Sequence, residues 1–176
     1  MKEFSGKRFQ VETEKVRLPN GHIMRLEKTD SKEVALVVPI TDDNKMVVLK
    51  QYRPVIKKWI YEFPAGLVEH GEKPVSAAKR EVEEETGFVC KNIKKLGGFF
   101  SSPGFSNEFI HVFVAECRKE SEQRLEPAEN ILVYTLPAKK VIGMAKNGKF
   151  INGHALSALL LNLLHGDDFK LQQRRL

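Results

Sequence analysis

Residues 66–88 read GLVEHGEKPVSAAKREVEEETGF, and they predict one helix with both of its ends marked. Residues 74–86 contain no glycine and repeat apolar side chains at helical spacing. Pro74 stands in what would be the first turn, where its missing N–H removes no hydrogen bond. Gly87 follows the last periodic residue and suits a left-handed cap. We therefore expect a helix over residues 74–86.

Three carboxylates on this helix would share one face. Glu81, Glu84 and Glu85 stand at i, i+3 and i+4, and like charges at this spacing destabilise a helix by about 0.2–0.5 kcal/mol per pair. Such a patch favours a bound cation. Because carboxylates are hard oxygen ligands and no Cys or His pattern lies nearby, Mg²⁺ or Mn²⁺ suits the patch better than Zn²⁺. The alternative is an acidic helix face that meets only solvent.

Composition narrows the class of protein. The 176 residues suffice for one domain with a sizeable core. The net charge is +6, but Lys and Arg are spread along the chain, so we expect no nucleic-acid partner and instead an anionic small molecule. The first ten residues contain no apolar signal region, and no long apolar run follows, so we expect a cytoplasmic protein without a membrane partner. Cys90 and Cys117 have no CxxC spacing and indicate neither a disulfide framework nor a thiol metal site.

Strand and turn signals surround the helix. Residues 8–18 and 22–26 alternate polar and apolar side chains around Asn20-Gly21, a type I′ turn signal, and so predict a β-hairpin. A second hairpin is predicted from residues 33–40 and 45–52. Four further strands are predicted at residues 59–63, 97–101, 109–115 and 131–135. Two helices are predicted, one at residues 137–145 and one from residue 152 onward. We expect the last helix to be well buried, and the residues from 169 to 176 to form a basic tail.

The spacing of the charged and glycine residues resembles a known family. The Nudix box is matched at every specified position by Gly66, by Glu72 after five intervening residues, and by REVEEETGF over residues 80–88 after seven more. The chain thus resembles the Nudix hydrolases, which implies their α/β fold, an α/β/α sandwich with a mixed β-sheet. The resemblance implies a Nudix domain over residues 31–168. An N-terminal β-hairpin over residues 1–30 would be an addition, open to exchange within a dimer.

Two segments outside the box resemble the ADP-ribose pyrophosphatase branch of the family. One is QYRP over residues 51–54 followed by EFPAG over residues 62–66, and the other is SPGFSNE over residues 102–108. In the second segment Pro103 lies sixteen residues past Gly87, the position that marks this branch. The resemblance assigns substrate binding to Arg53, Glu62, Pro103 and Gly104. Arg53 would contact the diphosphate or the terminal ribose, and the other three residues would line the substrate site. The alternatives are a surface cation at Arg53 and a simple turn at Pro103-Gly104.

The resemblance also implies the metal and catalytic residues. Glu81 and Glu85 would bind divalent ions, with Glu84 and the Ala65 carbonyl completing the shell. Arg80 would orient these carboxylates. A further carboxylate is expected from the later acidic loop LEPAEN, residues 125–130, where Pro127 and Ala128 interrupt the acidic run. The candidates are Glu129 as a metal ligand, Glu126 as the general base and Glu108 as the alternative base.

The combined hypothesis is a Mg²⁺-dependent hydrolase, with Mn²⁺ as a possible substitute, that converts ADP-ribose to AMP and ribose 5-phosphate. A homodimer is expected, in which Phe4 and Phe9 of the N-terminal hairpin would stack on adenine. Three alternatives remain. They are a Nudix enzyme for another nucleoside diphosphate sugar, an enzyme for damaged nucleoside triphosphates, and a non-catalytic module that binds ADP-ribose.

Overall fold

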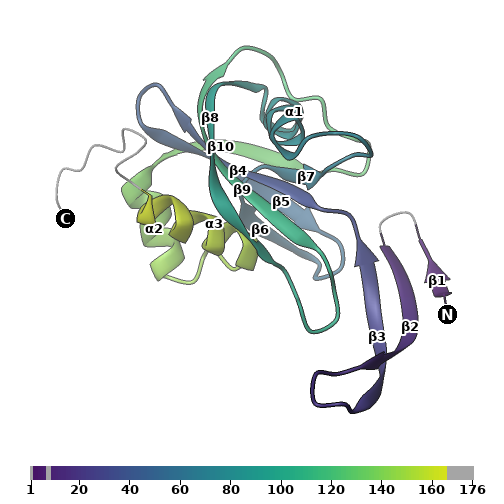
Figure 1. Cartoon of the computed structure of the whole chain (residues 1–176). Helices are drawn as coiled ribbons and strands as arrows, with labels where there is room; N and C mark the ends of the chain where they lie inside the picture. The colour runs from purple at the N-terminus through teal and green to yellow at the C-terminus, as the bar shows by residue number, and fades with distance from the viewer. Residues whose placement is uncertain (1, 7–8, 166–176) are drawn as a thin grey trace.

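The computed structural model of the chain describes residues 2–6 and 9–165, and it contains two β-sheets and three helices within them. Figure 1 shows a mixed sheet between helices, with a separate small sheet at the N-terminus. The elements are β1 Lys2–Ser5, β2 Phe9–Arg17, β3 Ile23–Ser31, β4 Val34–Thr41, β5 Lys45–Arg53, β6 Lys58–Glu62, β7 Ala65–Leu67, α1 Pro74–Thr86, β8 Phe88–Phe100, β9 Phe109–Lys119, β10 Ile131–Pro137, α2 Ala138–Lys146 and α3 Gly153–Leu164.

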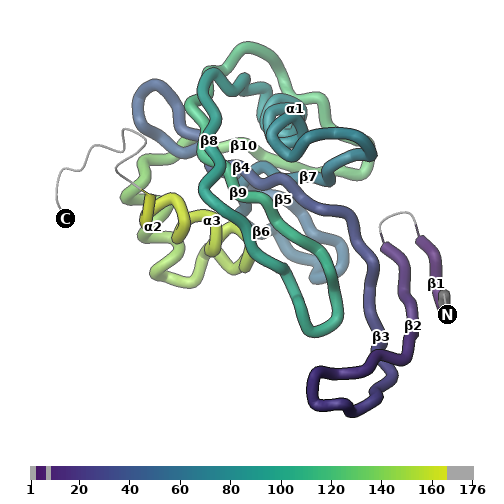
Figure 2. The backbone as a smooth tube through the Cα atoms, viewed as in Figure 1, coloured from purple at the N-terminus to yellow at the C-terminus, as the bar shows by residue number. Residues whose placement is uncertain are grey.

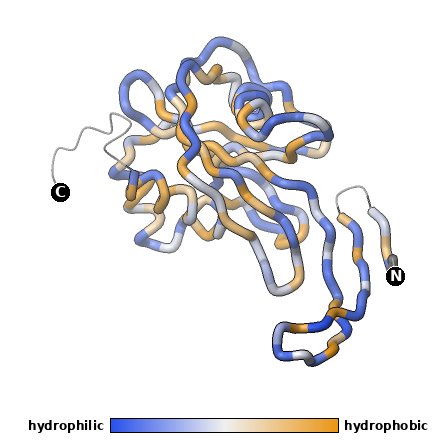
Figure 3. Tube along the Cα trace, in the orientation of Figure 1, coloured by the Kyte–Doolittle hydropathy of each residue, from blue (hydrophilic) through white to orange (hydrophobic). Residues whose placement is uncertain are grey.

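The large sheet has helices on both faces, which confirms the predicted α/β/α sandwich. Its strand order is β10-β5-β4-β9-β8, with β6 paired to β5 and β7 paired to β4. The sheet is mixed because β4 and β9 run parallel while the other pairs are antiparallel. Along β4, Leu36 and Val38 pack toward α2 and α3, whereas Ala35 and Val37 pack toward α1. This alternation produces two apolar cores, and Figure 3 shows the central strands as predominantly hydrophobic.

The predicted second hairpin, β4 with β5, is present but opens into a fork. The two strands pair at a single position, Ile40 with Met46. Beyond it β7 takes the place beside β4, and β6 takes the place beside β5. The amide of Val37 donates to the carbonyl of Pro64 at 3.0 Å, so the chain just before β7 also runs along β4. The fork therefore brings the start of the Nudix-like box against the centre of the sheet.

The N-terminal hairpin is confirmed and is larger than expected. Strands β2 and β3 pair from Phe9 with Ser31 to Arg17 with Ile23, and the short β1 adds a third strand. The type I′ turn was a wrong prediction, because only Asn44 and Lys57 combine a side chain with a positive φ among the described residues. In Figures 1 and 2 this sheet projects away from the body.

Two further predictions need correction. Strand β8 begins directly after the helix at Phe88, so the predicted strand at residues 97–101 is only its end. Helix α3 is buried on one face only, with Ala155, Ala158 and Leu159 covered while Leu160 and Leu164 are exposed. The predicted basic tail lies outside the described residues. No helix in the described part of the chain is long and apolar enough to cross a membrane.

Cys90 and Cys117 stand directly opposite each other on β8 and β9. Their sulfur atoms are 3.5 Å apart, and both are free thiols. The sequence separates them by many residues and gave no indication of this contact.

Candidate active site

Helix α1 begins and ends where its sequence predicts. Pro74 occupies the first turn, and Gly87 ends the helix with φ 71° while its N–H donates to the carbonyl of Glu83 at 2.8 Å. A β-carbon at Gly87 would lie 2.1 Å from the carbonyl oxygen of Ser121, so glycine is required both for its conformation and for space.

The last turn of α1 is held by Lys119, the last residue of β9, and by the segment that follows it to Arg124. The backbone N–H of Arg124 donates to the carbonyl of Glu84 at 2.8 Å, and the side-chain amide of Gln123 donates to the carbonyl of Glu85 at 2.7 Å. Lys119 reaches the carbonyl of Thr86 at 3.0 Å. These are carbonyl groups that a helix end leaves without intrahelical partners. The turn that carries two of the candidate metal ligands is thereby fixed by a distant segment, which sequence analysis missed.

Glu81 and Glu85 point from α1 toward the segment that precedes it. A β-carbon at Gly66 would lie 2.0 Å from the carboxylate carbon of Glu81, so the absence of a side chain at Gly66 admits this carboxylate. Glu85 is 4% exposed and accepts a hydrogen bond from the backbone N–H of Ala65 at 3.0 Å. The fork in the sheet and the helix thus bring Ala65, Glu81 and Glu85 together.

Burial shifts the ionisation of these two carboxyl groups. Burial, followed by the charge of Glu81, raises the pKa of Glu85 well above its usual range. Burial also raises the pKa of Glu81, although the neighbouring Arg80 acts in the opposite direction. The charge of Glu129 raises both pKa values further, so this loop residue lies within the electrostatic reach of the pair. A divalent cation would reverse these penalties by stabilising the ionised forms.

The donor set fits a hard divalent cation. It consists of carboxylates and backbone carbonyl groups, which are the oxygen ligands of Mg²⁺ and Mn²⁺. Yet no three acidic, histidine or cysteine side chains in the described ranges are arranged as a complete metal shell. Nη1 of Arg80 hydrogen-bonds Glu81 at 2.5 Å and Glu84 at 3.1 Å. A metal ion would therefore compete with this guanidinium for two of its ligands.

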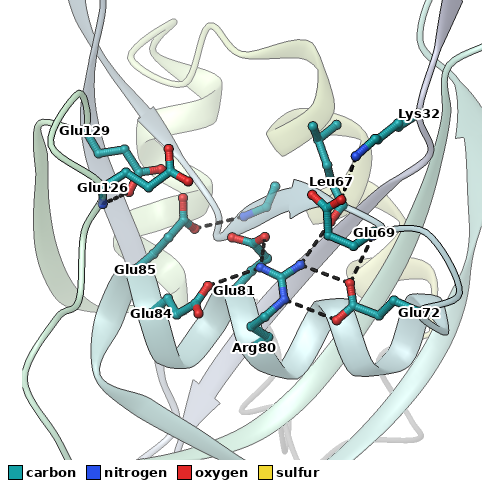
Figure 4. A network of polar contacts seen from close by, with 11 residues as sticks. Lys32, Leu67, Glu69, Glu72, Arg80, Glu81, Glu84, Glu85, Glu126 and Glu129 are labelled. Carbon is teal, nitrogen blue, oxygen red and sulfur yellow. Dashed lines mark hydrogen bonds and ion pairs between the residues drawn. The ribbon is translucent and has the colours of Figure 1, made fainter. Parts of the chain in front are cut away.

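Arg80 links the helix to the loop before it, as Figure 4 shows. Its Nε and Nη2 atoms each donate to the carboxylate of Glu72 at 3.1 Å, and Nη2 also donates to the carbonyl of Leu67 at 3.0 Å. These contacts raise the pKa of Arg80 and lower that of Glu72. Arg80 thus contacts three carboxylates, those of Glu72, Glu81 and Glu84, while its role in orienting them for catalysis stays a prediction.

Arg53 lies in a second polar pair, on the neighbouring strands β5 and β6. Its Nε donates to Glu62 at 2.9 Å and its Nη2 donates to the other oxygen of the same carboxylate, which is 4% exposed. Hydrogen bonding to Glu62 raises the pKa of Arg53, and the charges of Glu85 and Glu129 raise it further. Arg53 is therefore more than a surface cation: its partly exposed guanidinium pairs with a buried carboxylate.

The predicted substrate loop, residues 102–107, forms a turn at Pro103 and Gly104. The backbone N–H of Ser106 donates to the carbonyl of Ser102 at 2.8 Å, and both Pro103 and Gly104 are exposed. The loop is tied to β3, since the N–H of Thr29 donates to the carbonyl of Phe105 at 2.7 Å. Glu108, at the end of the loop, is half-buried. The turn is thus confirmed, and contact of Pro103 or Gly104 with substrate stays a prediction.

The two acidic candidates of the later loop differ in their surroundings. Figure 4 shows Glu126 and Glu129 near the end of α1 where Glu85 lies. Glu129 is half-buried, accepts a hydrogen bond from the N–H of Glu126 at 2.9 Å, and influences the pKa of Glu85. Glu126 is exposed. The roles of Glu129 as a metal ligand and of Glu126 as the general base stay predictions.

A family model named NUDIX domain matches residues 31–158. The chain belongs to the Nudix family. Among curated Nudix relatives, ADP-ribose pyrophosphatase of Bacillus subtilis (strain 168) is 40% identical over 130 residues, which cover 74% of this chain and 70% of that protein. The methanol dehydrogenase activator of Bacillus methanolicus is 35% identical over 158 residues, covering 89% and 85% of the two chains.

A third Nudix relative and a solved structure extend the comparison. GDP-mannose pyrophosphatase of Salmonella arizonae (strain ATCC BAA-731 / CDC346-86 / RSK2980) is 32% identical over 161 residues, covering 83% of this chain and 81% of that one. A solved structure described as an ADP compounds hydrolase superposes with a TM-score of 0.81 at 25% identity, covering 95% of this chain and 92% of that chain.

Proposed function

We propose that this Nudix hydrolase cleaves the diphosphate of ADP-ribose to AMP and ribose 5-phosphate with the help of Mg²⁺. The observation that carries the proposal is the buried carboxylate of Glu85, held by the N–H of Ala65 beside the partly buried Glu81, with the cation Arg53 bonded to Glu62 three residues before Ala65. A diphosphate needs both a metal ion and a fixed cation to offset its charge. The name of the Bacillus subtilis relative and the description of the structural neighbour support the substrate class.

The residues that would hold the metal are Glu81 and Glu85, with Glu84, Glu129 and the carbonyl of Ala65 completing the shell. When bound, the metal would neutralise the diphosphate and lower the pKa of a water molecule. Arg80 keeps the carboxylates in place through its bonds to Glu81, Glu84 and the loop.

Proton transfer needs a carboxylate that is not a metal ligand. Glu126 would accept the proton of the attacking water, and the half-buried Glu108 is the alternative. The water oxygen forms a bond to phosphorus while the bond to the bridging oxygen breaks, which releases AMP and ribose 5-phosphate. Arg53 would contact the diphosphate or terminal ribose, and Glu62 with the loop at Pro103 and Gly104 would line the site.

We also propose a homodimer built on the N-terminal sheet. Phe4 and Phe9 are 54% and 45% exposed, and their ring centroids lie 6.0 Å apart. Both rings lie on a sheet that projects from the body (Figure 2), and Ile23 and Met24 are also exposed, at the far end of the β2–β3 pair. Exchange of this sheet between copies is part of the proposal. A cytoplasmic location fits a chain with two cysteines and no disulfide framework.

A substrate panel tests the proposal. The purified protein is incubated with ADP-ribose, GDP-mannose, diadenosine polyphosphates and 8-oxo-dGTP, with Mg²⁺, with Mn²⁺ or with a chelator, and the products are separated by chromatography. We expect AMP and ribose 5-phosphate from ADP-ribose in the presence of either metal. Faster turnover of GDP-mannose, to which a relative's name points, would overturn the substrate assignment. Equal turnover in chelator would overturn the metal requirement.

A further inference from the structure

The side chain of Asn152 serves two partners from separate parts of the chain. Its Oδ1 accepts a hydrogen bond from the N–H of Ala155 at 2.9 Å and so caps helix α3. Its Nδ2 donates to Oε1 of Glu62, on β6, at 3.1 Å. The cap requires the amide oxygen of Asn152 to face the helix, and the carboxylate of Glu62 can accept only from the amide nitrogen. Both bonds therefore require the same orientation of the Asn152 side-chain amide.

Glu62 depends on such donors because it is nearly inaccessible to water. A buried carboxylate is costly unless its oxygen atoms are hydrogen-bonded. Oε1 of Glu62 has two donors, Nε of Arg53 at 2.9 Å and Nδ2 of Asn152, while Oε2 accepts from Nη2 of Arg53. Asn152 is therefore the donor that fixes the rotation of this carboxylate independently of Arg53.

The rotation of the carboxylate determines where the guanidinium of Arg53 points. The guanidinium of Arg53 and the carboxylate of Glu62 are joined by two parallel hydrogen bonds, so a rotation of the carboxylate rotates the guanidinium plane with it. Nη1 of Arg53 makes no hydrogen bond to any described residue, and the side chain is 39% exposed. Glu62 lies three residues before Ala65, whose N–H donates to Glu85, so the Arg53–Glu62 pair adjoins the carboxylate cluster. The charge of Glu85 also acts on the guanidinium.

We propose that Asn152 is a positioning residue of the active site, which acts through Glu62 to aim the free edge of Arg53 at the diphosphate-linked substrate. This role rests on the proposed function of the Arg53 site. It differs from helix capping alone, because capping uses only Oδ1 and positioning uses only Nδ2.

Asn152→Ser separates the two roles. Serine is also a good N-cap, so the start of α3 is kept, but its side chain is too short to reach Glu62. We expect a modestly lower melting temperature, because the buried Glu62 loses one donor, and a KM for ADP-ribose raised about 10-fold with little change in kcat. Ser157→Ala is the matched control, because Ser157 lies on the same helix and lines the same surface hollow of about 330 Å³ as Asn152. It should leave both constants unchanged.

A double-mutant cycle with Arg53→Ala tests whether Asn152 acts through Arg53. If it does, adding Asn152→Ser to Arg53→Ala raises KM no further. Additive losses, or wild-type kinetics of Asn152→Ser, would overturn the proposal. If Asn152→Ser unfolds, Asn152→Asp replaces it, since aspartate keeps the cap and places a second carboxylate against Glu62. Its KM should then be raised, because the added carboxylate disturbs the pairing of Glu62 with Arg53, and a wild-type KM would contradict the role.

The same measurements separate this role from the substrate assignment. If the wild-type protein does not hydrolyse ADP-ribose, the proposed function fails. The cycle is then run with the panel compound that is hydrolysed. A coupling between Asn152 and Arg53 in that reaction would still support positioning, and its absence would overturn it.

Discussion

The carboxylate of Glu81 occupies the space that a β-carbon of Gly66 would need, since the two would lie 2.0 Å apart. This relationship explains why a Nudix box begins with glycine here. The helix places the Glu81 carboxylate against the backbone of β7, and only a residue without a side chain permits the approach. The geometry of the site therefore depends on an absent group as much as on the carboxylates themselves.

Gly66→Ala should displace the Glu81 carboxylate and lower kcat/KM by about 100-fold or more, because small misplacements of a catalytic group are costly. The folded state should persist, which circular dichroism and a kinetic assay can check together. Gly143→Ala is the control, because nothing lies near a β-carbon at this helical position. It should keep full activity and stabilise the protein by about 0.5–1 kcal/mol. Normal activity of Gly66→Ala would contradict the close approach.

Mg²⁺ should stabilise the protein more strongly as the pH rises. Folding raises the pKa of Glu85 above its ordinary value of 4.5, so its contribution to stability is full below that pH and is lost as the pH rises through the folded-state pKa. Bound Mg²⁺ compensates the ionised form. Thermal unfolding between pH 5 and 8 should show a growing Mg²⁺-dependent shift in Tm. Glu85→Gln should abolish this shift and most of the activity, and a shift that does not vary with pH would contradict the assignment.

Arg80→Lys should destabilise the protein by about 1–2 kcal/mol at pH 7. Lysine cannot reproduce the hydrogen bonds that Nε and Nη2 of Arg80 donate to the carboxylate of Glu72 and the carbonyl of Leu67. Arg80 lowers the pKa of Glu72, so this contribution is present above pH 4.5 and is lost as the pH falls through the folded-state pKa of Glu72. Urea unfolding at pH 7 and pH 3 should therefore show a smaller difference between variant and wild type at the lower pH. Lys79→Arg, an exposed change on the same helix, should have no such effect.

Glu129→Gln and Glu126→Gln should fail in different ways. The charge of Glu129 reaches Glu81 and Glu85, so its neutralisation should raise the Mg²⁺ concentration needed for half-maximal activity. Glu126→Gln should lower kcat by about 10²–10⁴-fold without changing that concentration, as expected for a general base. Glu108→Gln is measured in parallel. If it shows the kcat loss and Glu126→Gln does not, the base is Glu108.

Replacing Phe4 and Phe9 by serine should weaken the proposed dimer, because both rings are exposed on the projecting sheet. Sedimentation velocity should show a shift toward monomer with the body still folded. Val55→Ser, at a side chain that is 96% exposed outside that sheet, provides the control. A wild-type sedimentation profile for the double variant would place any dimer contact elsewhere.

Features marked by neighbouring residues could be predicted from the sequence. Helix α1 was predicted with both ends because Pro74 and Gly87 act locally. The start of β8 was missed, since register shifts after Cys90 and after Lys95 break the alternation that identifies a strand. The exposure of Leu160 was also missed, because leucines surround α3 and their spacing does not reveal which face is covered.

In the candidate site, too, local motifs predicted some residues and missed others. The box residues and Arg53 were predicted because their motifs are contiguous. The roles of Gln123 and Asn152 were not, since each side chain meets its partner across a long separation in the sequence. Hydrogen bonds of this kind depend on how strands are ordered in the sheet, which no local pattern reports.

The hydrogen bonds from residues 119–124 to the last carbonyl groups of α1 affect the order in which the protein folds during synthesis. The ribosome synthesises every box residue before it synthesises Gln123 and Arg124, so the emerging helix has no partners for its last carbonyl groups. Those partners arrive only once β9 has formed its parallel pairing with β4, a slow and non-local step. Catalytic competence is therefore among the last properties that the nascent chain acquires, although its signature is near the middle of the message.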